Sequence, residues 1–191
     1  IQVILIGDTY DECQTVALRA AKKEEKTFIH AFDDVKVIEG QATMALEILE
    51  QTSKPFDYVL VPVGGGGLIS GMITVLKALS PSTKIIGVEP EGAPSMSQSL
   101  AQNKRISLKT MDRFVDGAAI RQVGVIPFEI CKQHLDEIIT VAEGKICQTI
   151  LDLYNKEGIV AEPAGALAIA GLESINADLQ NKHVALMLCG G

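Results

Sequence analysis

The sequence predicts an α/β fold in which helices cover both faces of a parallel β-sheet. Three observations support this class. Strand-like segments such as 57–63 are continuously apolar rather than alternating, which is typical of strands buried on both faces. Segments with a helical apolar stripe lie between them, so strands and helices alternate along the chain. With 191 residues, 47% of them hydrophobic and 21% charged, the chain can bury a sizeable core.

The N-terminal part contains two predicted strands and two predicted helices. Residues 3–7 (VILIG) form a short apolar run that predicts a buried strand, and residues 27–30 (TFIH) predict a weaker one. Apolar residues from Cys13 to Ala20 recur at the spacing of one helical face, where the Cys13 thiol acts as a small hydrophobe. A second helical stripe runs from Ala42 to Leu49 and ends before Pro55.

The rest of the chain continues the alternation. The predicted strands are 57–63, 84–89, 137–142 and 183–189, and the predicted helices are 68–79, 147–154 and 164–175, with Cys147 on an apolar face. Segment 90–127 is the least regular, and we expect its loops to line a site. In a parallel sheet of this class, ligands bind at the carboxyl ends of the strands.

Composition excludes several classes of function. The net charge of −7 and the low aromatic content of 4% argue against a nucleic-acid-binding groove. No apolar run approaches the ~20 residues of a membrane span, and no signal peptide is visible. The four cysteines contain no CxxC pair, which favours a reducing, cytoplasmic setting without disulfides. The chain starts without Met and stops directly after a strand, so we expect both ends to be cut.

The stretch PVGGGGLISG (62–71) places four consecutive glycines between a predicted strand and a predicted helix. The start of a helix carries unpaired N–H groups and a partial positive charge, and glycines let an anion approach them closely. The loop therefore predicts a phosphate site built from backbone N–H groups. The alternative, a glycine-rich turn for close packing of strand on helix, stays open.

Two common phosphate-binding motifs are not matched by the sequence, and this limits the kind of phosphate that the loop is expected to bind. The Walker pattern needs Lys and Ser or Thr after its last glycine, but residues 72–73 are Met and Ile. The pattern G-x-G-x-x-G is not matched, although Glu89 lies near the place of a ribose-binding acid and keeps that alternative open. Lys77, the first cation after Gly67, lies about 15 Å further along the helix. These features favour a single small phosphate over a polyphosphate.

Other candidate site residues could also have a purely structural role. Cys189 is expected at the same sheet edge as the glycine loop, where the alternative is inert packing. Glu162 precedes a helix, where the helix dipole favours an acid. FVDGAA (114–119) reads as an Asp-Gly turn. Asp33 and Asp34 are adjacent, so they point apart and make a poor acid–base pair.

Six blocks in a characteristic order carry a family resemblance. They are AFDDVKVIEGQAT (31–43), VPVGGGGLISG (61–71), IIGVEPEGAPSM (85–96), FVDGAAI (114–120), IVAEPAGALA (159–168) and LCGG (188–191). On these blocks the chain resembles the fold-type II (tryptophan synthase β-like) pyridoxal-phosphate enzymes, and among them the threonine dehydratases. The resemblance implies a three-layer, parallel-sheet fold in two domains, both incomplete here. Residues 1–40 would belong to the small domain and 41–191 to the large one.

The resemblance also implies roles for residues. The residues that would bind the phosphate of pyridoxal 5′-phosphate through their N–H groups are Gly64, Gly65, Gly66, Gly67 and Leu68. Cys189 would face the pyridine nitrogen and leave it largely unprotonated, which weakens the ring as an electron sink. Gly117 and Glu162 match positions that line the cofactor pocket. The Schiff-base lysine is expected upstream, so no catalytic residue is assigned and the chain alone is expected to be inactive.

The activity that the resemblance implies is that of a lyase of amino-acid metabolism. It converts L-threonine to 2-oxobutanoate and ammonia, in isoleucine biosynthesis, as a cytoplasmic homo-oligomer. Two alternatives stay open: a serine dehydratase or serine racemase of the same fold, and a non-catalytic ligand-binding fragment. The racemase branch binds a divalent metal near GVEP, but Ser95 stands where that branch has an acid, so no metal is expected.

Overall fold

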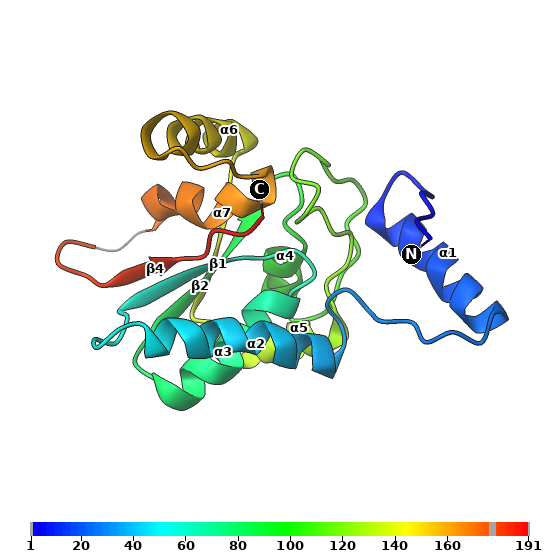
Figure 1. The fold of residues 1–191 in the computed structure, drawn as a ribbon, viewed down its shortest axis with the longest axis horizontal. Coiled ribbons are helices and arrows are strands. Elements are labelled where there is room, and N and C mark those ends of the chain that lie inside the picture. Colours follow the sequence, from blue (N-terminus) through cyan, green and yellow to red (C-terminus); the bar gives the residue numbers. More distant parts are fainter. Residues whose placement is uncertain (1, 176–178, 191) are drawn as a thin grey trace.

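The computed structural model describes residues 2–175 and 179–190 (Figure 1). Ile1, in the predicted small domain, and Gly191, in the terminal glycine pair, lie outside the described residues. Four parallel strands form one sheet in the order β3-β2-β1-β4. The strands are β1 (Tyr58–Pro62), β2 (Lys84–Pro90), β3 (Glu137–Val141) and β4 (Val184–Leu186). The predicted parallel α/β class is confirmed.

Helices cover both faces of this sheet and produce three layers (Figure 1). One face carries α2 (Val35–Glu50), α3 (Gly67–Leu79) and α5 (Val125–His134). The other carries α6 (Glu143–Asp152) with a π-helical turn (Leu153–Glu157), and α7 (Pro163–Gly171) with a 3-10 turn (Leu172–Ser174). The short α4 (Ser95–Ala101) follows β2, and α1 (Tyr10–Lys23) lies at the N-terminal side.

The central strand β1 explains the continuous apolar run. Successive side chains point to opposite faces, so Val59 and Val61 pack with α2, α3 and α5, while Leu60 packs with α6 and α7. All three are fully buried. Because both faces are covered, every position of the strand has to be apolar.

The register brings distant segments to one edge of the sheet. Pro62 of β1 pairs with Val88 of β2, and Leu60 pairs with Leu186 of β4. Since the strands are parallel, the glycine loop after β1 and the residues after β4 leave the sheet at the same edge.

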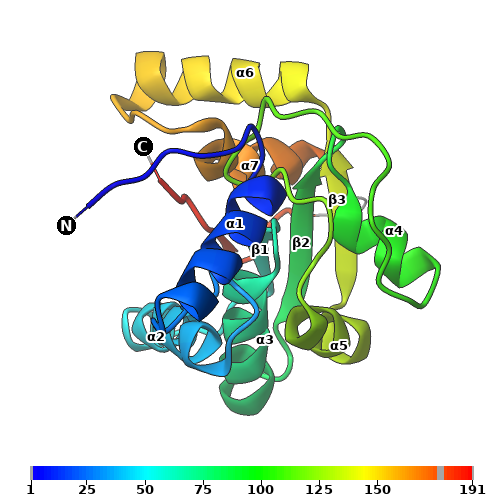
Figure 2. The same cartoon turned by 90° about the vertical axis from the view of Figure 1, so that its right-hand side faces the viewer.

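The N-terminal strand predictions are wrong. Residues 2–34 contain no strand, and segments 3–7 and 27–30 are irregular. The side chains of Val3 and Leu5 are 77% and 93% exposed. A strand has to pair its N–H and C=O groups with a neighbour, and no described strand lies beside these segments. Figure 1 shows α1 to the side of the three layers, and in the turned view of Figure 2 it lies in front of them. Its predicted apolar face, with Cys13, is not buried.

Three smaller differences concern other elements. Helix α4 lies inside segment 90–127, which was predicted to be irregular, and α5 begins in that segment and continues over residues 128–134, for which no element was predicted. Cys147 of α6 is exposed rather than packed. The proposed domain division at residue 40 falls inside α2, which is continuous and buries Ile38 as well as Ala45; the division itself stays a prediction.

Candidate functional site

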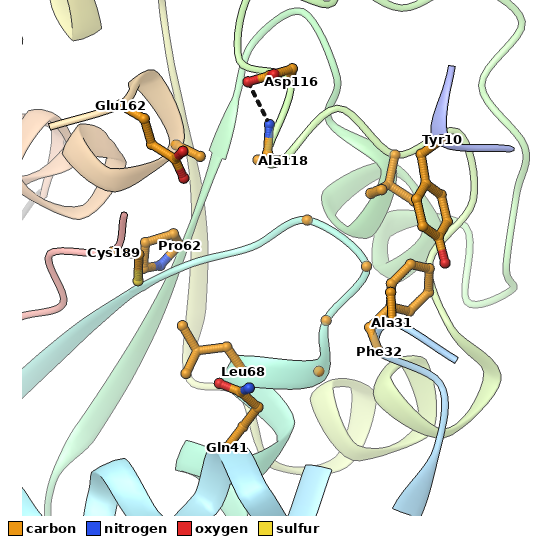
Figure 3. A pocket seen from close by; sticks show the side chains of 17 residues that line it. Tyr10, Ala31, Phe32, Gln41, Pro62, Leu68, Asp116, Ala118, Glu162 and Cys189 are labelled. Carbon is orange, nitrogen blue, oxygen red and sulfur yellow. Dashed lines mark hydrogen bonds between the residues drawn. The ribbon is translucent and has the colours of Figure 1, made fainter. Parts of the chain in front are cut away.

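A cavity of about 380 Å³ lies at the carboxyl edge of the sheet (Figure 3). All six predicted cofactor-binding residues line it: Gly64, Gly65, Gly66, Gly67, Leu68 and Cys189. Further lining residues are Tyr10, Ala31, Phe32, Gln41, Pro62, Asp116, Gly117, Ala118, Ile120, Glu162 and Ala164. This volume is in the range of small-molecule sites.

The glycine loop directs unpaired N–H groups outward from the start of α3. Gly66 is the N-cap residue with φ +97°, a backbone conformation that favours glycine. Its C=O accepts hydrogen bonds from the N–H of Ser70 at 3.1 Å and the hydroxyl of Ser70 at 2.6 Å. Because C=O and N–H point in opposite directions in a trans peptide, the N–H of Gly67 points away from the helix. In the described part of the chain, the N–H groups of residues 64–68 have no hydrogen-bond partner.

Close packing also requires glycine in this loop. A Cβ at Gly65 would collide with the ring of Phe32, and one at Gly67 would lie 3.0 Å from Phe32 Cα. A Cβ at Gly64 would lie 3.1 Å from the Cα of Ala118. The alternative interpretation, a glycine-rich turn for close packing, therefore explains why these positions of the loop carry no side chain. Packing does not account for the row of unpaired N–H groups, which are suited to bind an anion.

Cys189 lies on the side of the cavity away from Tyr10 and Phe32 (Figure 3). The chain after β4 passes tightly over α7, since a Cβ at Gly165 would collide with the carbonyl oxygen of Cys189. Burial raises the pKa of the Cys189 thiol, and the charge of Glu162 raises it further. The thiol is therefore neutral at neutral pH, and it can share only a weak hydrogen bond with a ligand nitrogen.

Glu162 and Asp116 line the cavity and also have local structural roles. Glu162 is the N-cap residue of α7, and its N–H donates to the C=O of Gly190 at 3.3 Å. The Asp116 carboxylate accepts the N–H of Gly117 at 2.9 Å, within the predicted Asp-Gly turn, in which the N–H of Ala118 donates to the C=O of Val115 at 3.0 Å. Both simpler interpretations are consistent with the structure, and both side chains still border the cavity.

Glu89 does not belong to this cavity. Its carboxylate is fully buried and caps α4 by accepting the N–H groups of Met96 at 2.6 Å and Ser97 at 2.8 Å. Burial raises its pKa to about 7, against the effect of these two hydrogen bonds. Glu89 was the acid that kept the dinucleotide-binding alternative open. Its carboxylate instead binds the N-terminus of α4. Within the described ranges, no group of three or more His, Cys, Asp or Glu residues is arranged so that it could hold a metal ion, and the absence of a metal stays a prediction.

Sequence reasoning missed the aromatic wall of the cavity. Phe32 lies against the glycine loop, with its ring 5.5 Å from the ring of Tyr10 and 4.7 Å from that of His30. The signal in the sequence is the Phe of the FDD motif, which directly precedes the two acids. Those acids do serve separate purposes: Asp33 caps α5 and Asp34 caps α2.

The residues present fit pyridoxal 5′-phosphate. Unpaired N–H groups at a helix start suit its phosphate, and a neutral thiol suits an unprotonated ring nitrogen. Leu68 and Phe32 add apolar surface to the wall of the cavity. Lys and Arg are absent from the described residues that line the cavity, so the phosphate would depend on N–H groups and the α3 dipole.

Comparison with known proteins agrees with this geometry. The chain is 50% identical over all of its 191 residues to "L-threonine dehydratase biosynthetic IlvA" of Halalkalibacterium halodurans, of which it covers 46%. It is similar to the structure of threonine deaminase isoform 2 from Solanum lycopersicum, with a TM-score of 0.89 and 41% identity over 98% of this chain and 55% of that one. It is also similar to the crystal structure of a threonine deaminase from T.th., with a TM-score of 0.91 and 36% identity over 100% and 63% of the two chains.

The chain thus spans about half the length of the curated relatives that it matches. The family described as "Pyridoxal-phosphate dependent enzyme" matches residues 1–190. This match covers nearly the entire sequence and includes the glycine loop, the aromatic wall and Cys189. The chain therefore belongs to the family of pyridoxal-phosphate dependent enzymes.

Proposed function

We propose that the full-length protein uses pyridoxal 5′-phosphate to deaminate L-threonine to 2-oxobutanoate and ammonia. The observation that carries the proposal is the cavity itself, which has unpaired loop N–H groups and the Cys189 thiol among its walls. The relatives named threonine dehydratase and threonine deaminase support the choice of substrate. The reaction is assigned to the full-length protein because the chain covers 46% of its curated relative.

The residues of this chain have three tasks in the proposed reaction. The N–H groups of Gly64 to Leu68 bind the phosphate and fix one end of the cofactor. The neutral thiol of Cys189 holds the ring nitrogen without transferring a full proton to it. Phe32 and Leu68 supply apolar surface to the wall of the cavity. When bound, the cofactor supplies an electron-accepting ring that assists loss of the α-proton and of the β-hydroxyl group.

The lysine that binds the cofactor covalently is not among these residues. No lysine lines the cavity in the described part of the chain. We place this lysine in the part of the full-length protein that the chain does not span, and we expect the chain alone to be inactive.

Substrate assays of the full-length protein test the proposal. We expect 2-oxobutanoate from L-threonine at a higher kcat/KM than pyruvate from L-serine, and no conversion of D-serine to L-serine. Preference for L-serine would indicate the alternative dehydratase, and racemisation without elimination would indicate the racemase.

Cofactor binding tests the site separately from the substrate. Gly65→Asp places a carboxylate against Phe32 and beside the phosphate, so we expect loss of the visible absorbance of the bound cofactor. Gly40→Ala is the matched control, because a Cβ at Gly40 of α2 meets no atom within 4 Å. Unchanged absorbance in the Gly65 variant would contradict a phosphate site at this loop.

Assembly and location complete the proposal. We propose a cytoplasmic homo-oligomer that serves isoleucine biosynthesis, which rests on the family resemblance and on the four free cysteines. Within the described residues, no helix is both long and apolar enough to cross a membrane. Sedimentation of the full-length protein, cell fractionation and isoleucine auxotrophy of a deletion strain test the three parts.

A further inference from the structure

The carboxylate of Asp33 lies at the start of α5, although the partners are 92 residues apart in the sequence. The N–H of Val125 donates to Oδ2 at 2.8 Å, and the N–H of Ile126 donates to Oδ1 at 2.9 Å. The N-cap residue of α5 is Gly124, which has no capping side chain. Asp33 therefore caps α5 from a distant segment, at the positive end of the helix dipole.

The same end of α5 holds the glycine loop in place. The N–H of Gly124 donates to the C=O of Gly65 at 3.0 Å. One turn further, Pro127 lies against Gly66, where an added Cβ would be 2.6 Å from the Cβ of Pro127. Gly124 and Pro127 do not line the cavity, so they contact the loop from its outer side.

This contact sets the direction of an N–H group in the proposed phosphate site. Because C=O and N–H of a trans peptide point in opposite directions, fixing the Gly65 carbonyl on Gly124 turns the N–H of Gly66 toward the cavity. Asp33 stabilises the turn from which Gly124 donates. Its neighbour Phe32 packs on Gly65 and Gly67, so two consecutive residues hold the loop.

We propose that Asp33 is a positioning residue for the phosphate-binding loop. It acts through α5 and Gly124, without touching the ligand, and its effect is specific to the phosphate part of the cofactor. The inference rests on the proposed function and deepens it. Asp34 provides a matched control, because it caps α2 through the N–H of Lys36 at 2.7 Å and lies on a different helix.

The experiment uses the full-length protein and two probes that differ by the phosphate, pyridoxal 5′-phosphate and pyridoxal. For Asp33→Ala we expect the Kd for pyridoxal 5′-phosphate to rise about tenfold, the size expected from loss of one helix cap. The Kd for pyridoxal should stay within about twofold of the wild-type value, since the altered N–H groups do not contact it. Asp34→Ala should lower Tm by about as much as Asp33→Ala does, but it should change neither Kd.

A conservative variant, Asp33→Asn, keeps the proposal testable if Asp33→Ala does not fold. Asp33→Asn keeps one acceptor oxygen, so we expect an intermediate rise of about threefold in the Kd for pyridoxal 5′-phosphate. Equal weakening of both probes, or no weakening in either Asp33 variant, would overturn the positioning role while leaving the phosphate site intact. If the wild type binds both probes equally, the phosphate site itself is wrong, and the role of Asp33 is rejected with it.

Discussion

Residues 2–34 and residues 35–190 follow similar sequence patterns but reach different degrees of burial. The layered body from Val35 onward has Leu60 and Leu76 fully buried in its two helix–sheet layers. In residues 2–34 no side chain is buried, and Leu5 is 93% exposed. Both regions contain apolar strand-like runs followed by amphipathic helices, so the difference does not come from composition.

The difference shows that an apolar run becomes a strand only where partners exist. In β1, hydrogen bonds to β2 and β4 satisfy the backbone, and helices cover both faces. Segment 3–7 has neither within the described residues. The N-terminal region nevertheless supplies a wall of the cavity through Phe32, so the site combines a packed loop with a side chain from the less buried region.

Truncation of leucine in each region gives the largest expected contrast. Leu60→Ala should lower the free energy of unfolding of the 191-residue chain by about 3 kcal/mol or more, because it leaves a cavity between the sheet and α7. Leu5→Ala should change it by less than about 0.5 kcal/mol, as for exposed positions. Urea denaturation without cofactor measures both. Equal losses would break the comparison and show that Leu5 is packed in solution.

The next prediction compares the buried carboxyl group of Glu89 with an exposed carboxyl group of the N-terminal region. The folded pKa of Glu89 is about 7, above its ordinary value of 4.5, so the folded state binds the extra proton between these values. The stabilisation is therefore complete below pH 4.5 and is lost as pH rises through 7, by roughly 3 kcal/mol in total. We expect Glu89→Gln to remove this slope in urea denaturation followed from about pH 5 to about pH 8.

Glu25→Gln is the control for this pH profile, since it removes the same charge from an exposed position of the N-terminal region. Its profile should stay parallel to that of the wild type. A slope that persists in Glu89→Gln would show that another group causes it, and would contradict the raised pKa of Glu89 as its source.

Gly71, at the contact between α2 and α3, and Gly40, in open space on α2, test where the packed body begins. A Cβ at Gly71 of α3 would lie 2.6 Å from the backbone N of Ala42, so Gly71→Ala should destabilise by about 1–3 kcal/mol. Gly40→Ala, in open space on α2, should stabilise by about 0.5–1 kcal/mol. Thermal unfolding checks both signs. A neutral Gly71→Ala would mean that α2 is loosely attached and belongs with the N-terminal region.

Some residues of the candidate site could be predicted from the sequence, and others are known only from the structure. The glycine loop and Cys189 could be predicted because each follows an apolar strand, and parallel strands bring such positions to one edge. The contributions of Phe32, Tyr10 and Asp33 could not, since no periodicity links residues 10–33 to residues 64–67 or 125–126. Only contacts between distant segments, such as the capping of α5 by Asp33, create those parts of the site.

The sequence by itself determined the α/β class, the parallel sheet and the backbone character of the loop PVGGGGLISG. These follow from local periodicity, from burial on two faces, and from the conformational freedom of glycine. The tertiary structure alone decided that residues 3–7 are not a strand, that Glu89 caps α4, and that each loop glycine faces a neighbour. Those outcomes depend on which partner is present in space, and a pattern along the chain carries no information about a partner far away in sequence.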